Sequence, residues 1–410
     1  MRVSLRRAFA AVLMTAVPAL AALPAPSPAQ AHTPVALAPL LGVGAPNSIP
    51  GRYIVTLAPG SDPSSVASAA GITPAHVYDS VMRGFAAPLT GRQLARVRAL
   101  PSVRGVEQDT TVILPAEDRV PVATGRRMPG TPPPPGGTGR FWGLERVNNR
   151  APATHGFTVR ATGAKVTAYI IDSGIDFTHP EFGGRARPGI DEMEDDDRDA
   201  ADCAGHGTHV AGTVGGEHTG IARGVSLVSV RVLDCEARGP NSGIIAGINW
   251  VARNAVRPAV ANISLGGLYS PTMNESLDAL ARSGVFPVVA AGNDDVSSCA
   301  ISPASATEAF TVAAIDRADH RAPFSNFGSC VNLNAPGVDI ASAFPGGLYA
   351  VMSGTSMAAP HVTGIAALYK DTYGDAGFES LKKWLLDHAT PTTAAEPWGT
   401  PRLVAFTGDL

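Results

Sequence analysis

Residues 166–174 decide the fold: they read VTAYIIDSG, an apolar run that ends in Asp172. Such a run is typical of a buried strand, and Gly174 allows the chain to turn directly after it. An isolated aspartate after a strand is most often a helix cap or a turn residue. Asp172 alone is therefore weak evidence for a functional site. It becomes a candidate site residue only together with the other reactive side chains described below.

Strand-like and helix-like segments alternate from residue 141 onward. The strand-like segments are residues 166–171, 225–233, 260–265 and 285–291. The segments with helical spacing are residues 207–214, 242–254, 273–283 and a last helix at 356–369. This alternation predicts an α/β fold with a parallel sheet covered by helices on both faces. Sites in such folds lie at the carboxyl ends of the strands, where Asp172 stands.

A histidine among small residues forms the second notable segment, GHGTHVAG at 205–212. Small neighbours let the backbone approach closely and leave the imidazole of His206 accessible. His206 and His209 are three residues apart and could instead ligate a metal, but no carboxylate or cysteine completes such a site. We expect His209 to pack within the helix.

The third segment is SGTSMAAPH at 353–361, where Ser356 opens an Ala-rich helix. A serine at such a place is ordinarily an N-cap. Here Gly354 and the small neighbours would leave the hydroxyl uncovered at the helix N-terminus, where the helix dipole favours developing negative charge. Pro360 lies early enough in the helix to predict a kink.

The three segments together resemble the signatures of the subtilase family, in the order Asp, His, Ser that is known for subtilisin. The matching residues are Asp172-Ser173-Gly174, His206-Gly207-Thr208-His209 and Gly354-Thr355-Ser356-Met357-Ala358. The resemblance covers residues 142–369 and is closest to the aqualysin-like branch of the proteinase K group. It implies a subtilisin-like serine endopeptidase with Asp172, His206 and Ser356 as its catalytic triad.

Further site residues are implied by the same resemblance. Asn293 ends the segment AAGN at 290–293, where the family places its oxyanion-hole donor; the alternative is a Gly-Asn turn. Substrate would bind as an extended strand between two edges, which favours broad specificity. The positions that match these edges are Ala237-Arg238-Gly239 and Ser264-Leu265-Gly266. Pro240 cannot donate a ladder hydrogen bond, which puts the outer subsites in question.

Residues 49–115 are predicted to form a small α+β domain. Strand-like segments at 52–57, 85–89 and 103–106 alternate with helices at 62–70 and 91–100. The segments YIV at 53–55, GFAA at 84–87 and VRGVEQD at 103–109 resemble the inhibitory propeptide of subtilases. As a propeptide, the domain would assist folding and then inhibit the enzyme. The alternative is a permanent accessory domain.

The remaining segments are predicted to lie outside folded domains. Residues 1–31 have the basic start, apolar run and small-residue cleavage site of a signal peptide, which predicts a secreted protein. The apolar run is short and contains Pro18, which argues against a membrane anchor. Arg6-Arg7 leaves export by the twin-arginine route open. Residues 31–48 are expected to be unstructured, and residues 116–140 to form a Pro/Gly-rich linker.

The composition excludes several classes of function. Of the 410 residues, 45% are hydrophobic and 16% charged, and the formal net charge is −3. This balance argues against general disorder and offers no basic surface for nucleic acid. We expect a monomer whose partners are protein and peptide substrates and its own propeptide, and which needs no cofactor for catalysis.

The four cysteines suggest two disulfides in an exported protein, and three connectivities are possible. A metal site is disfavoured because no CxxC pair exists. The resemblance to the aqualysin-like branch implies that Cys203 pairs with Cys235 and Cys299 with Cys330.

Structural calcium is a further implication of the resemblance. Members of this branch bind it through backbone carbonyls, here at Thr307 and Ala309, and through one aspartate, where this chain has Asn332. An amide oxygen carries no charge, so weaker affinity follows. The acidic run DEMEDDD at 191–197 is a second candidate, with a solvated acidic loop as the alternative.

Two other classes of function compete with a peptidase. A catalytically silent binding protein would not need an intact triad and Asn293. An ester hydrolase would carry a Gly-x-Ser-x-Gly turn, which the sequence around Ser356 lacks.

Overall fold

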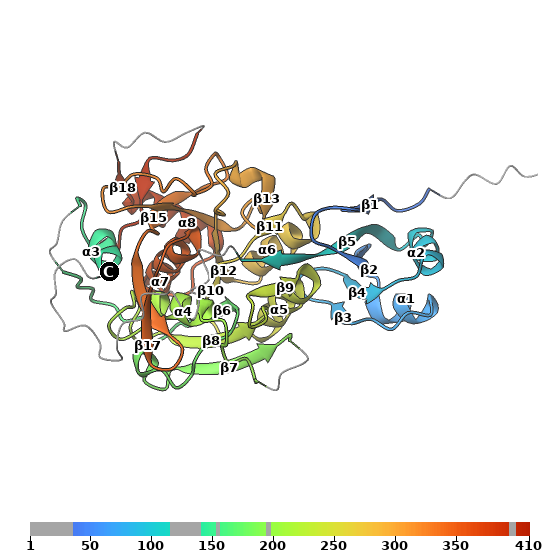
Figure 1. Ribbon diagram of the computed structural model, residues 1–410, viewed down its shortest axis with the longest axis horizontal. Coiled ribbons are helices and arrows are strands. Elements are labelled where there is room, and N and C mark those ends of the chain that lie inside the picture. Colours follow the sequence, from blue (N-terminus) through green and yellow to red (C-terminus); the bar gives the residue numbers. More distant parts are fainter. Residues whose placement is uncertain (1–35, 115–140, 153–155, 194–197, 393–398) are drawn as a thin grey trace, which may run out of the picture. The chain divides into compact units, whose positions relative to one another are not determined.

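The computed structural model describes residues 36–114, 141–152, 156–193, 198–392 and 399–410 (Figure 1). All of these except Ala36 belong to one compact unit, Leu37–Leu410. The predicted signal peptide, the predicted linker and residues 194–197 of the acidic run lie outside the described residues. Within the described residues, no helix is both long and apolar enough to cross a bilayer.

A nine-stranded sheet forms the framework of the larger domain, in the order β18-β19-β15-β14-β12-β10-β6-β8-β7. Every neighbouring pair is parallel except β18 with β19. The strands are β6 (Thr167–Asp172), β7 (Ala186–Asp191), β8 (Ser226–Arg231), β10 (Ala259–Ile263), β12 (Val285–Ala290), β14 (Phe310–Ile315), β15 (Leu333–Pro336), β18 (Thr390–Pro391) and β19 (Leu403–Val404).

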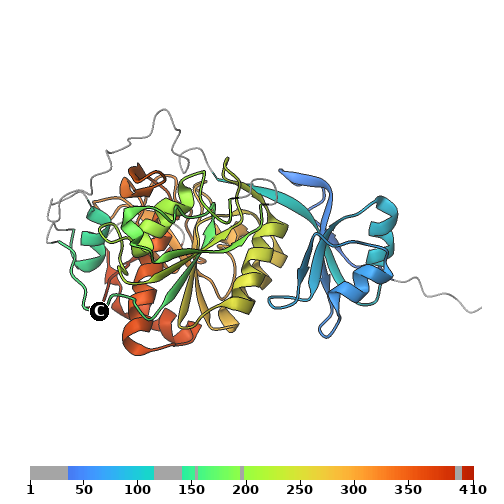
Figure 2. The same ribbon diagram turned by 90° about the horizontal axis from the view of Figure 1, so that it is seen from below.

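Helices cover both faces of this sheet, as predicted (Figure 2). Successive residues of β6 show it: Ala168 and Ile170 pack in one apolar cluster, while Tyr169 and Ile171 pack in the other. The first cluster includes residues of α3 (Trp142–Asn148), α4 (His206–Gly215), α7 (Thr355–Tyr373) and α8 (Phe378–His388). The second includes residues of α5 (Asn241–Asn254) and α6 (Pro271–Arg282).

The smaller domain is a mixed sheet in the order β1-β5-β2-β4-β3 with two helices. Its elements are β1 (Leu40–Leu41), β2 (Ser48–Leu57), α1 (Pro63–Ala69), β3 (His76–Tyr78), β4 (Gly84–Pro88), α2 (Gly91–Arg98) and β5 (Val103–Ile113). Short strands and hairpins complete the chain: β9 (Arg238–Pro240), β11 (Gly267–Leu268), β13 (Ile301–Ser302), β16 (Ile340–Phe344) and β17 (Leu348–Met352).

Three expectations about elements were wrong. Residues 31–48 were expected to be unstructured, but β1 pairs in parallel with β5 at Val106 and Glu107. The helix at 356–369 is not the last, because α8 follows it, and strands β3, β7, β14 and β15 were not predicted. Strands β1 and β3 are two and three residues long, so they carry no periodic signal and depend on the edge against which they pair.

Candidate active site

Asp172 and His206 form a buried hydrogen-bonded pair. Asp172 is the last residue of β6, and its Oδ1 lies 2.8 Å from Nδ1 of His206. The same oxygen accepts from the backbone N–H of Ser173 at 2.7 Å. His206 begins α4 directly after Gly205, whose φ of +96° requires the left-handed conformation that glycine adopts readily. The strand end and the helix start therefore bring the two side chains together.

A second buried aspartate, which the sequence analysis missed, holds this helix start in place. Asp202 Oδ1 accepts from the hydroxyl of Ser173 at 2.9 Å, and Oδ2 accepts from the N–H and hydroxyl of Thr208 at 2.9 and 2.6 Å. Ser173 Oγ accepts in turn from Gly207 N–H at 3.0 Å. Burial raises the pKa of Asp202 above its ordinary value, although the hydrogen bonds act in the opposite direction. An aspartate four residues before a helical histidine is the signal that could have found it.

Ser356 lies near the same edge of the sheet. It is the second residue of α7, and its hydroxyl donates to the backbone carbonyl of Ser264 at 3.1 Å. Ser264 directly follows β10, the neighbour of β6 in the sheet. Consequently the carboxyl ends of two adjacent strands place Ser356 and the Asp172–His206 pair at one edge.

Asn293 lies beyond β12, on the other side of β10, and Thr355 fixes the orientation of its amide. Its Oδ1 is 2.9 Å from the N–H of Thr355 and 2.8 Å from the Thr355 hydroxyl. A backbone N–H can only donate, so the contacting atom must be the amide oxygen. Nδ2 is then the donor end of Asn293. The orienting role of Thr355 was also missed, since a threonine at a helix start has no distinctive pattern.

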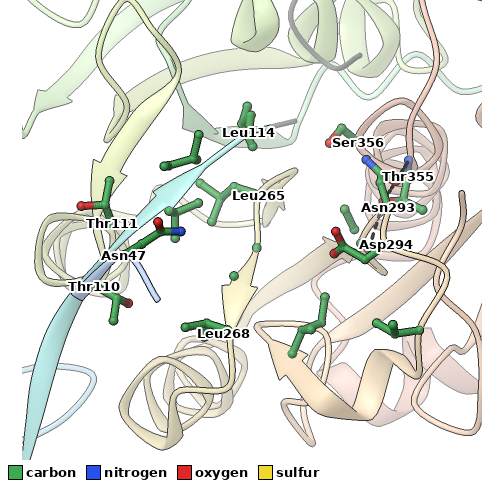
Figure 3. Close-up of a pocket in the computed structure, with 18 residues that line it drawn as sticks. Asn47, Thr110, Thr111, Leu114, Leu265, Leu268, Asn293, Asp294, Thr355 and Ser356 are labelled. Atoms are coloured by element: carbon green, nitrogen blue, oxygen red, sulfur yellow. Dashed lines mark hydrogen bonds between the residues drawn. The ribbon is translucent and has the colours of Figure 1, made fainter. Parts of the chain in front are cut away.

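A pocket of about 350 Å³ adjoins these residues (Figure 3). Asn293, Thr355 and Ser356 lie on one side of it, and Thr110, Thr111 and Leu114 of the smaller domain lie on the other. Leu265 and Gly266, two of the predicted substrate-binding residues, also line it.

The other predicted substrate edge is paired with a strand of the chain itself. β5 runs antiparallel to β9, with Ile113 opposite Arg238, Val112 opposite Gly239 and Thr111 opposite Pro240. Leu114 N–H continues the ladder by donating to the carbonyl of Ala237 at 3.1 Å. The N–H of Thr111 donates instead to the carbonyl of Asn47 at 2.9 Å. The edge at 237–239 thus accepts an extended strand, and Pro240 does not prevent the pairing.

Two carboxylates of β5 meet the N-termini of two helices of the larger domain. Asp109 accepts from the N–H and hydroxyl of Ser242 in α5 at 3.1 and 2.6 Å. Glu107 accepts from the N–H and hydroxyl of Thr272 in α6 at 3.3 and 2.6 Å. Burial raises the pKa of both carboxyl groups. These contacts hold β5 against the larger domain just before the residues that pair with β9.

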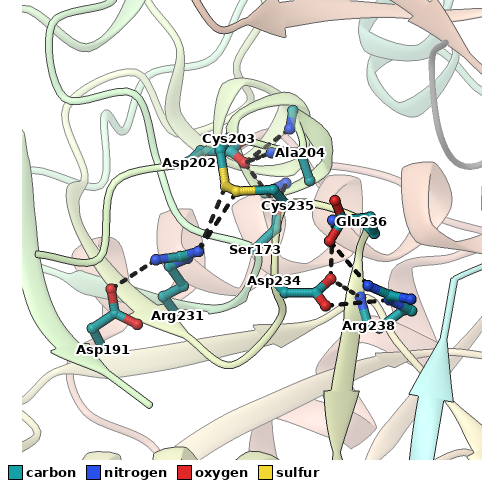
Figure 4. Close-up of a disulfide and its surroundings, with 12 residues drawn as sticks. Ser173, Asp191, Asp202, Cys203, Ala204, Arg231, Asp234, Cys235, Glu236 and Arg238 are labelled. Carbon is teal, nitrogen blue, oxygen red and sulfur yellow. Dashed lines mark hydrogen bonds and ion pairs between the residues drawn. A yellow bond between two sulfur atoms is a disulfide. The ribbon is translucent and has the colours of Figure 1, made fainter. Parts of the chain in front are cut away.

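Two disulfides are present, Cys203–Cys235 and Cys299–Cys330, with Cα–Cα distances of 4.9 and 5.3 Å. This is the pairing that the resemblance implies. The first joins the loop before α4 to the turn before β9 (Figure 4). The buried guanidinium of Arg231 lies beside it, with Nη2 3.5 Å from Cys203 Sγ and Nη1 3.0 Å from Asp191 Oδ2.

The proposed calcium ligands do not fit a strong calcium site. Asn332 Oδ1 already accepts from the backbone N–H of Thr311 at 2.7 Å. Glu308, the acidic residue between Thr307 and Ala309, is paired with Arg282 at 3.0 Å. In the described part of the acidic run, Asp191 is engaged by Arg231. The described residues contain no group of three or more His, Cys, Asp or Glu side chains able to hold a metal ion.

An aspartate–histidine pair at a strand end, with a serine at a nearby helix start, is the arrangement of the serine peptidases. The chain belongs to the subtilase family and is a serine endopeptidase. The subtilase model matches residues 163–403, which extends past residue 369, and a peptidase inhibitor I9 model matches residues 52–115. The inhibitor domain makes the chain a zymogen.

Individual relatives agree with this assignment. An extracellular serine proteinase from Thermus sp. (strain Rt41A) is 41% identical over 399 residues, which cover 90% of this chain and 92% of that protein. The alkaline serine protease ver112 from Corniculantispora psalliotae is 37% identical over 381 residues, covering 91% and 94%. The crystal structure of a cold adapted subtilisin-like serine proteinase matches with a TM-score of 0.63 and 43% identity, covering 65% of this chain and 97% of that one.

The disulfides generate a first prediction. Each closes a loop of about 30 residues, and the chain-entropy model assigns roughly 3.7 kcal/mol to each. A reducing agent under mildly denaturing conditions should therefore shorten the half-life of the active enzyme. Peptide mapping without reduction should recover the two pairs found here. An unchanged half-life with both bonds demonstrably reduced would contradict the prediction.

Asn332 generates a second prediction. Calcium should change the melting temperature of the wild-type enzyme little, because no carboxylate is available at this position. Asn332→Asp keeps an oxygen for Thr311 N–H and adds a charge, so it should raise the melting temperature in calcium relative to EDTA. Glu308→Asp, a change that adds no charge, is the matched control. Equal melting temperatures of the aspartate variant in calcium and in EDTA would contradict it.

Proposed function

We propose that the chain is the secreted precursor of a peptidase of broad specificity that acts through Asp172, His206 and Ser356. The observation that carries the proposal is the strand β5, which lies in the cleft beside Ser356 as a substrate would. Its domains would be a signal peptide at 1–31, an inhibitory propeptide at 49–115, a linker at 116–140 and a catalytic domain at 141–410. The mature enzyme would be a monomer.

In the proposed reaction, Ser356 Oγ attacks the scissile carbonyl and its proton passes to Nε2 of His206. The hydroxyl, which donates here to Ser264, must first turn toward the imidazole. Asp172 holds Nδ1 of His206 as the protonated nitrogen and stabilises the imidazolium without taking its proton. Nε2 then protonates the leaving amine, and an acyl-enzyme on Ser356 remains. Water hydrolyses it with His206 again as the base.

The negative charge that develops on the substrate oxygen would be stabilised by two donors. One is Nδ2 of Asn293, whose orientation is set by Thr355. The other is the backbone N–H of Ser356 at the start of α7, where the helix dipole also favours negative charge. Donors held in place before the reaction need no reorganisation during it.

The substrate would occupy the place of β5. Its backbone would pair with Ala237, Arg238 and Gly239 on one side and approach Ser264, Leu265 and Gly266 on the other. Backbone hydrogen bonds recognise the extended conformation of a peptide and depend little on its side chains, which supports broad specificity. A casein assay with a serine-directed inhibitor separates this function from its two competitors. A silent binding protein would clear no casein, and an ester hydrolase would cleave ester substrates alone.

The role of Asn293 is tested by two substitutions. Asn293→Asp keeps an oxygen for Thr355 but replaces the amide donor with a carboxylate, while Asn293→Ala removes both. Each should lower kcat by on the order of 10²–10³-fold with little change in KM, the range for such a donor in subtilisin itself. Asn254→Ala, at an exposed position of α5, should leave kcat unchanged. An unchanged kcat in the aspartate variant would rule out the oxyanion role.

Maturation supplies the next prediction. The Ser356→Ala precursor should fold, accumulate uncut and fail to digest casein, because the cut that releases the propeptide requires the nucleophile. A trace of active enzyme added to it should cut the chain between Leu114 and Arg140, which mass spectrometry of the products would locate. If the pure variant matures without added protease, or digests casein at the wild-type rate, Ser356 is not the nucleophile.

A further inference from the structure

A proline interrupts the helix that carries Ser356. In a regular helix the N–H of residue 360 would donate to the carbonyl of residue 356, but Pro360 has no N–H. Ser356 and Pro360 are both buried. A buried carbonyl without a hydrogen-bond donor would destabilise the folded state. We therefore expect another donor to bond to the Ser356 carbonyl.

The hydroxyl of Ser264 supplies that donor. Ser264 Oγ lies 2.9 Å from the carbonyl oxygen of Ser356, and Ser264 is fully buried. In the opposite direction, the Ser356 hydroxyl donates to the carbonyl of Ser264 at 3.1 Å. Two hydrogen bonds therefore tie the start of α7 to the chain that follows β10.

Two further side chains orient the Ser264 hydroxyl. Asn262 Nδ2 donates to Ser264 Oγ at 2.8 Å, and the hydroxyl of Thr363 donates to Asn262 Oδ1 at 2.8 Å. Asn262 and Thr363 are fully buried as well. A hydroxyl has one proton, and Ser264 uses it on the carbonyl of Ser356, so it must accept from the amide. The chain of bonds starts and ends on α7 and spans the interruption at Pro360.

We propose that Ser264 is a positioning residue for the nucleophile, whose hydroxyl replaces the N–H that Pro360 lacks. The backbone of Ser356 carries both the attacking hydroxyl and the N–H of the oxyanion hole. A shift of that backbone would therefore displace two catalytic groups at once. The inference rests on the proposed role of Ser356. It concerns the side chain of Ser264, whereas the substrate would approach the backbone at this position.

The first test is Ser264→Ala in the mature enzyme. A small displacement of reacting groups lowers rates by up to about 10²-fold, so we expect kcat to fall by about 10- to 10²-fold. KM should change far less, because the edges that bind substrate remain. Ser276→Ala is the matched control: Ser276 is also fully buried, and its hydroxyl donates to the helical carbonyl of Thr272 at 2.8 Å. That variant should keep the wild-type kcat.

The second test is rescue by the helix itself. Pro360→Ala restores an N–H at the position where the regular helical bond to the Ser356 carbonyl forms. The double variant Ser264→Ala/Pro360→Ala should therefore have a higher kcat than Ser264→Ala alone. A role limited to general packing would give a double variant that is worse than either single one. That result, or an unchanged kcat in Ser264→Ala, overturns the proposal.

The variants are best matured by a tagged active enzyme that is then removed, so that slow self-processing does not limit the yield. Burst titration with an acylating substrate gives the active-site concentration for each kcat. If Ser264→Ala does not accumulate, Thr363→Val tests the same chain from its far end with little change of shape. It should also lower kcat, and an unchanged value overturns the proposal. A negative result with these variants would not contradict the assignment of Ser356 as the nucleophile. Only a Ser356→Ala variant that is still active would contradict that assignment.

Discussion

The site depends on the register of three neighbouring parallel strands. Asn262 of β10 lies opposite Val288 of β12 on one side and Ile170 of β6 on the other. In this register the carboxyl ends of the three strands lie side by side, so Asp172, Ser264 and Asn293 all lie at one edge of the sheet. A slip by one residue would move every side chain of a strand to the opposite face. The two apolar clusters that hold the sheet together therefore also hold the catalytic geometry.

Much of this arrangement can be predicted because its signals are local. Asp172 follows an apolar strand, His206 stands among small residues, and Ser356 opens a helix, so each is visible in its own segment. Thr355 acts on Asn293, 62 residues away, and the hydroxyl of Ser264 acts on Ser356, 92 residues away, so nothing in their own segments marks them. Their roles depend on which buried groups need a donor or an acceptor, and only the fold determines that.

The contact between β5 and the larger domain balances opposing electrostatic effects. Glu107 and Asp109 are two residues apart, so they lie on the same face of the strand. Each loses hydration on burial, and each gains a hydroxyl, an N–H and the positive end of a helix. These compensating interactions form only when Glu107 meets the start of α6 and Asp109 meets the start of α5. The pair of carboxylates therefore selects one register for the strand. Other extended peptides in the cleft would lack this selection.

The short strand β1 has a consequence for how latency ends. β5 is paired with both β1 and β2 at its start, and the carbonyl of Asn47 holds Thr111 near its end. The segment in the cleft therefore cannot withdraw like a loose peptide, because it is the middle of a folded sheet. It can leave together with the folded small domain, or after that sheet unfolds or is cut. Release of the segment then involves the contacts of Glu107 and Asp109 as well as the bonds between β5 and β9, because the strand carries the small domain with it.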